Sequence, residues 1–179
     1  TLYIILTFAE FVLLYGTGSM DLFDSINHSL TTLPTGGFST HDASIGYYDS
    51  VLVELIVVVF MFIAGVNFTL LWMFWEGDSK KALRDEEFRY YTIYIVVVVL
   101  AVAGALIGSG TSVGKALRDS LFQVVSIGTS TGFGSADYMH PSWPLATHLL
   151  IFILMIVGAS AGSTGGGLKL LRVTLAFKV

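Results

Sequence analysis

The chain has 179 residues, of which 54% are hydrophobic and only 12% are charged. A soluble domain carries about 25% charged residues, so this composition points away from an ordinary soluble enzyme. The formal net charge of -4 has the wrong sign for a nucleic-acid-binding surface, and we expect no nucleic-acid partner. Cysteine is absent, so the sequence carries no information about redox compartment.

Four apolar stretches follow one another along the chain. Residues 1–17 and residues 51–75 contain one charged residue each, and residues 90–108 contain none. The last stretch, residues 143–158, is also uncharged but shorter. A helix needs about 20 apolar residues to cross the hydrocarbon core of a bilayer, so two of these stretches suffice and two come close. The pattern predicts an all-α, multi-pass membrane protein.

Basic residues predict the orientation of these spans. Most of them lie in the mixed-charge segment 76–89 or near the C-terminus, and the positive-inside rule then makes both places cytoplasmic. We therefore interpret residues 76–89 as a cytoplasmic linker. The chain starts with Thr and stops just after an apolar stretch, which we interpret as a sign that it is a fragment of a longer protein.

An internal repeat is visible in the sequence. Residues 24–42 and 119–137 align without gaps, and each segment lies between two apolar stretches. The identical pairs are Asp24/Asp119, Ser25/Ser120, Gly37/Gly132, Phe38/Phe133 and Asp42/Asp137. The chain thus consists of a span, a short segment and a span, then a charged linker, then the same order again.

Each short segment has two parts. Residues 24–33 and 119–128 can each form a helix about 15 Å long, too short to span. Asp24 and Asp119 suit the N-termini of these helices, where a carboxylate accepts backbone N–H groups. The parts that follow, PTGGFST and TSTGFGS, are rich in Gly, Thr and Ser. Irregular backbone at membrane depth must be buried in protein or line a wet path, and carbonyl rings can replace the hydration shell of K⁺. The alternative is a pair of extracellular loops made of turn residues.

A third glycine-rich segment, GASAGSTGGG at residues 158–167, follows the last apolar stretch. Each Gly in a helix costs about 1 kcal/mol relative to Ala, so this run should break the helix. Broken helices of this kind mark ion sites in transporters. The alternative is a Gly cap followed by a cytoplasmic turn. The corresponding apolar stretch of the first half, residues 51–75, has only Gly65 and Asn67 at the equivalent place. We expect it to form one continuous helix.

The sequence contains three long motifs: TLPTGGFSTHDASIGYYDS, FQVVSIGTSTGF and GASAGSTGGGLKLLRV. They resemble the Trk/Ktr/HKT family of potassium transporters, and the Trk branch most closely. The resemblance covers the whole chain. It implies repeats two and three of four, each made of an outer helix, a pore helix with a filter, and an inner helix, with the second inner helix broken. The expected boundaries are repeat 1–75 (outer helix 1–17, pore helix and filter 21–40, inner helix 51–75), linker 76–89 and repeat 90–179 (outer helix 90–108, pore helix and filter 114–135, broken inner helix 142–179).

The resemblance also implies site residues. The expected K⁺ filter consists of Thr35, Gly36, Gly37, Phe38, Ser130, Thr131, Gly132 and Phe133. The expected gating loop consists of Gly158, Ala159, Ser160, Ala161, Gly162, Ser163, Thr164, Gly165, Gly166 and Gly167. K⁺ is then the transported ion, and no organic cofactor is expected in this chain. The implied partners are the missing repeats of the same polypeptide, a second full-length subunit, a cytosolic nucleotide-binding regulatory subunit and the bilayer of the bacterial inner membrane.

Two other functions stay open at this point. Residues 158–162 fit G-x-S-x-G, which would make Ser160 the nucleophile of an intramembrane serine hydrolase. That motif requires a strand before the serine, and His148 would lie about 18 Å away along a helix. The other alternative is a membrane channel for another ion, or a structural membrane subunit.

Overall fold

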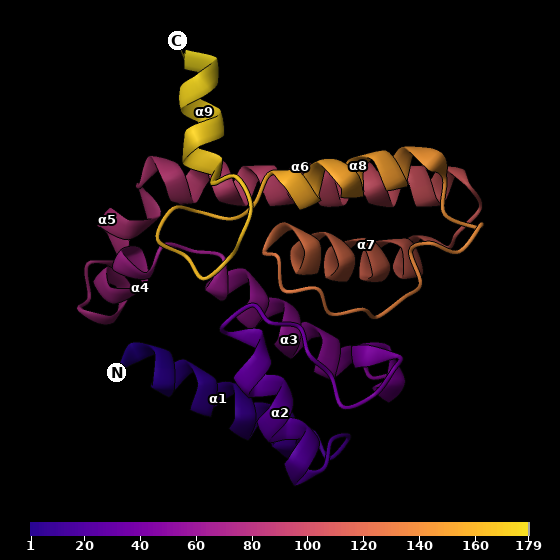
Figure 1. Cartoon of the computed structure of the whole chain (residues 1–179), viewed down its shortest axis with the longest axis horizontal. Helices are drawn as coiled ribbons and strands as arrows, with labels where there is room; N and C mark the ends of the chain where they lie inside the picture. The colour runs from indigo at the N-terminus through magenta and orange to yellow at the C-terminus, as the bar shows by residue number, and fades with distance from the viewer. Residues whose placement is uncertain (179) are drawn as a thin grey trace.

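The structure is a computed structural model that describes residues 1–178. Within that range the chain folds almost entirely into helices joined by loops, so the all-α prediction is confirmed for the described part (Figure 1). Val179, the last residue of the expected inner segment 142–179, lies outside it. The elements are α1 (Leu2–Gly16), α2 (Leu22–Thr32), the 3₁₀ helix η1 (Ser44–Tyr48), α3 (Val51–Ala64), α4 (Phe68–Trp75), α5 (Ser79–Leu83), α6 (Glu86–Gly108), α7 (Val113–Gly128), α8 (Leu145–Ile156) and α9 (Leu170–Lys178).

The helices form two groups that follow the sequence repeat. In the first, α1 packs on α2 and α3; in the second, α6 and α8 pack on each other and on α7. Contacts between α3 and α7 join the groups, and Figure 1 shows α7 alongside α6 and α8. The shared core consists of fully buried apolar side chains from both groups, including Val57, Met61, Val102 and Phe122.

Among the described helices, α6 alone is both long and apolar enough to cross a bilayer as a single straight element. The pair α3 and α4 meets the same criteria only when taken together, and the two helices meet at an angle of 106°. Two further helices, α1 and α8, are apolar but shorter. Many apolar side chains of these helices, such as Phe8, Leu100 and Phe152, are exposed. This is the surface expected of a protein that lipid or further helices cover.

The expectation that residues 51–75 form one continuous helix is wrong. Helix α3 ends at Ala64, and Asn67 begins α4 by accepting a hydrogen bond from Thr69 N–H at 2.9 Å. The carbonyl of Gly65 leaves the helix ladder and accepts the N–H of Ser160 at 3.1 Å. A Cβ at position 65 would overlap the Tyr91 hydroxyl, so only glycine lets the bend pack this closely. The break therefore depends on segments far away in the sequence.

The predicted capping roles of Asp24 and Asp119 are wrong, although α2 and α7 begin within one residue of the bounds 21 and 114 that the resemblance implies. Asp21, not Asp24, caps α2 by accepting the Asp24 N–H at 2.7 Å. Helix α7 starts after Ser112, so Asp119 lies inside it rather than at its start. Its 16 residues make it longer than the segment 119–128 expected from the repeat, yet still shorter than a span. Both aspartate side chains are thus free for other contacts than helix capping.

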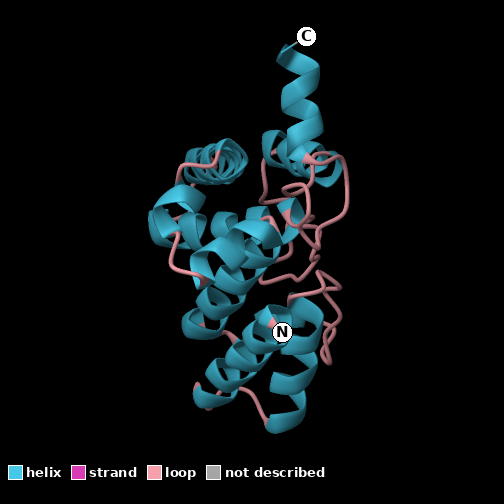
Figure 2. Ribbon diagram, turned by 90° about the vertical axis from the view of Figure 1, so that its left-hand side faces the viewer, coloured by secondary structure: helices cyan, strands magenta, loops and turns pink. Residues whose placement is uncertain are grey.

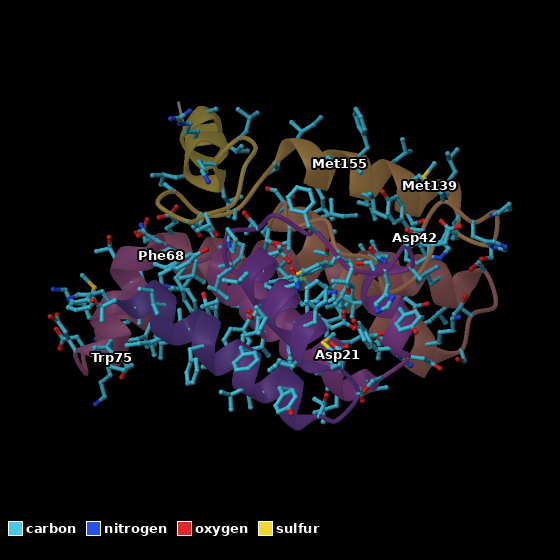
Figure 3. All side chains as sticks on the ribbon, turned by 60° about the horizontal axis from the view of Figure 1, so that its bottom comes forward. Asp21, Asp42, Phe68, Trp75, Met139 and Met155 are labelled. Atoms are coloured by element: carbon cyan, nitrogen blue, oxygen red, sulfur yellow. The ribbon has the colours of Figure 1, made fainter. Side chains whose placement is uncertain are left out.

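The loops are not distributed evenly around the helices. Figure 2 shows most of the long irregular segments gathered along one side of the molecule. In Figure 3, Asp42 and Met139, which follow the two glycine-rich short segments, lie near one end. Phe68 and Trp75 of α4 lie at the opposite end, next to the charged linker. Both post-helix loops therefore share one end of the molecule, as a tandem repeat requires.

Candidate functional site

The segments that follow α2 and α7 share an unusual backbone conformation. Thr35 and Gly37 have φ angles of 56° and 65°, and their counterparts Ser130 and Gly132 have φ angles of 63° and 87°. These angles lie in the left-handed region, which glycine enters freely and which costs other residues about 1–2 kcal/mol. In an ordinary extended strand, successive carbonyl groups point to opposite sides. A left-handed residue at every second position lets successive carbonyl groups point to the same side.

Each segment is held by the end of its own helix. In the first, Thr31 O accepts the N–H groups of Gly36 and Gly37 at 2.9 and 3.2 Å. In the second, Ser126 O accepts the N–H groups of the corresponding residues, Thr131 and Gly132, at the same two distances.

The hydroxyls of the same two helix residues complete the arrangement. Thr31 Oγ1 donates to Phe38 O at 2.8 Å, and Ser126 Oγ donates to Phe133 O at 2.6 Å. The sequence alignment pairs Thr31 with Ser126, but it gave no reason for the hydroxyl. The structure supplies one, because each hydroxyl fixes the carbonyl at the far end of its segment.

The two segments lie against each other. A Cβ added to Gly37 would overlap the carbonyl oxygen of Thr131, so these two backbones are in direct contact. Further along, Gly134 O accepts the Gly46 N–H at 3.0 Å, and Gly134 N–H donates to Ser44 Oγ at 3.2 Å. All of the expected filter residues are therefore brought into one region.

The two phenylalanines of this region have different surroundings. Phe133 is 1% exposed and its ring lies 5.7 Å from that of His28, centroid to centroid. Its counterpart Phe38 is 75% exposed. The repeat thus preserves the backbone of the two segments but not what their aromatic side chains contact.

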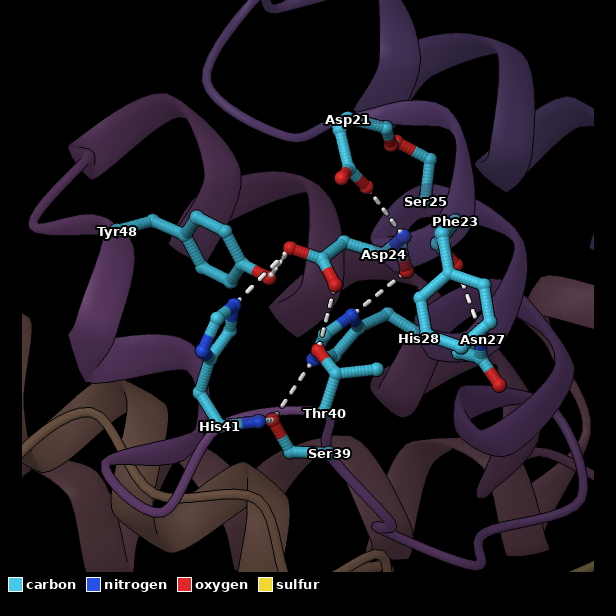
Figure 4. Close-up of polar contacts among 10 residues, drawn as sticks. All are labelled: Asp21, Phe23, Asp24, Ser25, Asn27, His28, Ser39, Thr40, His41 and Tyr48. Atoms are coloured by element: carbon cyan, nitrogen blue, oxygen red, sulfur yellow. Dashed lines mark hydrogen bonds and ion pairs between the residues drawn. The ribbon is translucent and has the colours of Figure 1, made fainter.

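A polar cluster behind the first segment ties it to the start of α2 (Figure 4). The Asp24 carboxylate accepts hydrogen bonds from Thr40 Oγ1 at 2.7 Å, from Tyr48 OH at 2.7 Å and from His41 Nε2 at 3.1 Å. Burial by itself raises the pKa of Asp24, but these three donors outweigh it and hold the pKa below its usual range. Asp24 is therefore a fully satisfied carboxylate that anchors the chain after the filter segment.

The glycine-rich loop, residues 158–167, lies directly beside both segments. Thr35 Oγ1 donates to Thr164 O at 3.0 Å, and Thr164 Oγ1 donates to Leu33 O at 2.8 Å. Gly166 N–H donates to Ser130 Oγ at 2.8 Å. The loop therefore contacts the corresponding residues, Thr35 and Ser130, of the two repeats.

The same loop is anchored on its other side by the bend between α3 and α4. Thr164 N–H donates to Ala64 O at 3.3 Å, and Phe68 N–H donates to Gly162 O at 3.2 Å. Close approach requires glycine within the loop, since a Cβ at Gly158 would overlap the carbonyl of Gly166. The loop takes up the backbone groups that the broken helix α3–α4 leaves unpaired.

Sequence reasoning missed two residues that hold this loop. Glu87, in the first turn of α6, accepts the Ala161 N–H with one carboxylate oxygen and the Asn67 side-chain N–H at 3.4 Å with the other. Glu87 is one of several acidic residues in the linker sequence EGDSKKALRDEEFR, and nothing there distinguishes it. Lys169 also holds the loop by donating to the carbonyl of Gly165.

Ser160 does not have the surroundings of a nucleophile. Its side chain is 1% exposed, and its Oγ has no hydrogen-bond partner among the described residues. His148 Nδ1 instead contacts the Pro144 carbonyl at 3.1 Å. A serine nucleophile requires a base within hydrogen-bonding reach, so the geometry offers no support for the hydrolase alternative.

We predict that Ser160→Ala leaves ion flux through the full-length protein unchanged. Removal of a buried, unpartnered hydroxyl avoids a desolvation cost of about 1–3 kcal/mol, so the thermal midpoint should stay the same or rise. A fluorophosphonate probe should label neither the native protein nor the variant. Labelling of the native protein that disappears in the variant would restore the hydrolase interpretation.

Comparison with known proteins identifies the class to which this arrangement belongs. The family model named TrkH, described as "Cation transport protein", matches residues 1–179. The chain therefore belongs to the TrkH family of cation transport proteins, and the resemblance found in the sequence is confirmed. The fold agrees with a crystal structure of the potassium transporter TrkH from Vibrio parahaemolyticus, with a TM-score of 0.91 and 40% sequence identity over 98% of this chain and 38% of that one.

Individual relatives carry names of the same kind. The Trk system potassium uptake protein TrkH of Halomonas elongata is 39% identical over 93% of this chain and 34% of the relative. The Trk system potassium uptake protein TrkG of Escherichia coli is 36% identical, again over 93% of this chain and 34% of the relative. The chain thus spans about a third of the length of these relatives.

Proposed function

We propose that this chain forms two of the four repeats around a potassium-conducting pore in a bacterial inner membrane. The observation that carries the proposal is the matching pair of left-handed residues, Thr35 and Gly37 in one segment and Ser130 and Gly132 in the other. Two carbonyl-bearing segments in contact are half of the ring that replaces the hydration shell of K⁺. The relatives are named as a potassium uptake protein and a potassium transporter, so we propose K⁺ as the transported ion.

The helices support the same function electrostatically. Both α2 and α7 end directly at a filter segment, so the negative ends of their dipoles face the place where the cation would pass. Each helix is too short to span, and it returns through irregular backbone, which at membrane depth must line a wet path or be buried in protein. In this proposal the filter consists of Thr35–Phe38 and Ser130–Phe133, and further repeats of the same polypeptide complete the ring.

The glycine-rich loop is proposed as the gate. It contacts both filter segments on one side and the bend of α3–α4 on the other, through individual hydrogen bonds to hydroxyl and backbone groups. Such an element has few side chains to pack, so a few kcal/mol of differential binding can shift it between two arrangements. We propose that a cytosolic nucleotide-binding subunit supplies that difference from the side of the linker 76–89, and that two full-length subunits associate.

We expect Gly132→Ser to lower the preference for K⁺ over Na⁺ without abolishing flux. A side chain at this left-handed position costs about 1–2 kcal/mol, but no atom lies within 4 Å of an added Cβ, so the segment can still form. The measurement is the flux of K⁺ and Na⁺ into vesicles that contain the full-length protein. Gly110→Ser, at a left-handed position after α6 that is equally open, is the matched control. Equal ion preference in both variants would refute the filter assignment.

A further inference from the structure

Glu10 lies near the middle of α1 and is completely buried. The described residues alone cover its side chain, so neither water nor lipid reaches the carboxyl group in this arrangement. Both carboxyl oxygens lack a hydrogen-bond partner within residues 1–178. Buried polar groups of native proteins nearly always have a partner, and an ionisable residue at membrane depth points to a function.

The surroundings of Glu10 are strongly apolar. Helix α1 packs on α2 and α3, and an apolar cluster fills the contact between the first group of helices. The cluster consists of Leu33, Phe60 and Ala64, with Leu6, Ala9 and Ile56 packed against it. A carboxylate in such a place would lose its hydration without gaining a compensating charge, and a buried group avoids that cost by staying neutral.

The helices that pack on α1 bring no free cation to Glu10. Glu54 of α3 is buried too, but it accepts hydrogen bonds from Arg118 at 2.7 and 2.9 Å. On α2, the Asp24 carboxylate is occupied by the three donors described above, and both ring nitrogens of His28 have hydrogen-bond partners. The chain therefore holds two buried glutamates, one paired with a cation and one not.

The hydroxyl of Thr32, the last residue of α2, lies beside the Glu10 carboxyl group without being aligned to donate to it. Thr32 is also completely buried, and Oγ1 donates its proton to His28 O at 2.7 Å. A hydroxyl has one proton, so Thr32 can offer Glu10 only a lone pair. An ionised carboxylate would be repelled by this lone pair, whereas the O–H of a carboxylic acid can donate to it.

We propose that Glu10 is a neutral carboxylic acid that donates its proton to Thr32 Oγ1 and thereby fixes the junction between α2 and the first filter segment. Thr32 O accepts the Thr35 N–H at 2.9 Å, and the next carbonyl, Leu33 O, accepts the Thr164 hydroxyl of the glycine-rich loop at 2.8 Å. Glu10 is therefore a positioning residue, and its effect on ion transport rests on the proposed function.

The second repeat builds the same junction without a polar contact. The gapless alignment pairs Thr32 with Ile127, whose side chain has no hydrogen-bonding group. The proposed carboxylic acid therefore acts on the first filter segment alone.

Infrared spectroscopy of the full-length protein in vesicles tests the protonation state, because a neutral carboxylic acid has a C=O band separate from the bands of carboxylates. We expect Glu10→Gln to remove one such band at neutral pH. Glu54→Gln is the matched control and should remove none, since Arg118 keeps Glu54 ionised. Identical bands in the native protein and in Glu10→Gln would refute the proposal. Glu10→Leu removes the same group and serves if Glu10→Gln does not fold.

The same band tests the contact with Thr32. Valine has the shape of threonine but no lone pair, so Thr32→Val should shift the C=O band of Glu10. Thr32→Ser keeps the hydroxyl and should leave the band in place. An unshifted band in Thr32→Val would refute the hydrogen bond.

The preference for K⁺ over Na⁺ in vesicles separates a positioning role from space filling. Glu10→Gln keeps an N–H donor for Thr32 and should keep the native preference. Glu10→Met has a similar length but no donor, and it should lower the preference about 2- to 13-fold, the factor that one neutral hydrogen bond contributes. Native preference in Glu10→Met would refute the positioning role. The infrared bands do not depend on the proposed function, so they stand or fall separately from the filter assignment that Gly132→Ser tests.

Discussion

Gly37→Ala should abolish potassium flux through the full-length protein. The added Cβ would overlap the carbonyl oxygen of Thr131, and position 37 also has a left-handed φ of 65°. The strain alone costs about 1–2 kcal/mol, and the overlap can be relieved only if the two filter segments separate. Separation would destroy the carbonyl ring on which dehydration of K⁺ depends. The measurement is Rb⁺ uptake into vesicles at matched protein content.

The neighbouring glycine provides the control. A Cβ at Gly36 comes no closer than 3.4 Å to any other atom, the nearest being a flexible carbon of the Phe38 ring. Its φ is not in the left-handed region, so Gly36→Ala should fold and conduct. If both variants lose flux, the segment tolerates a side chain at neither position. Contact between the two repeats would then not be the cause of the loss. Normal flux in Gly37→Ala would refute the contact itself.

Deletion of residues 162–166 should raise ion flux and make it less dependent on the cytosolic partner. The deletion removes the hydrogen bonds that join the loop to Thr35 and Ser130. Each bond contributes about 0.5–1.5 kcal/mol, so the two together contribute about 1–3 kcal/mol. Since 1.4 kcal/mol corresponds to a factor of ten, an increase of roughly 5- to 140-fold is expected. Preference for K⁺ should be retained, because the filter segments are held by their own helices.

A length-preserving variant separates loss of the gate from general disruption. A Cβ at Gly166 would lie 3.5 Å from Ser130 Oγ, an ordinary contact, so Gly166→Ala should behave like the native protein. Flux of K⁺ and Na⁺ is measured in vesicles with and without the partner. A deletion variant that folds but shows unchanged or lower flux would make the loop a connector.

The irregular backbone of the two segments proposed as the filter could be predicted from sequence because its determinants are local. A gapless repeat with glycine at Gly37 and Gly132 permits left-handed backbone at both positions, and the helix before each segment supplies its hydrogen bonds. The hydroxyls of Thr31 and Ser126 were visible as a conservative pair. Their function followed only from the contact with the phenylalanine carbonyls.

The bend at Gly65 could not be predicted in the same way. An apolar run with one glycine and one asparagine is compatible with a continuous span, and what breaks it is the loop that donates to Gly65 O. Asp119 was misplaced for a related reason. Its repeat partner Asp24 lies in the first turn of its helix, but Ser112 starts α7 earlier, so Asp119 lies inside the helix.

Glu87 connects three parts of the chain that the sequence keeps far apart. Its carboxylate accepts N–H groups from the loop and from Asn67 at the bend, and it lies in the first turn of α6, within the linker segment 76–89. Any event at the linker that disturbs this carboxylate would change the free energy of the loop, and the loop in turn contacts the filter. Binding linkage is reciprocal, so an ion whose occupancy favours one arrangement of the loop must change the affinity for a linker-bound partner by the same factor. In the proposed function, external potassium would then be an effector of the proposed cytosolic subunit, although the two would not touch.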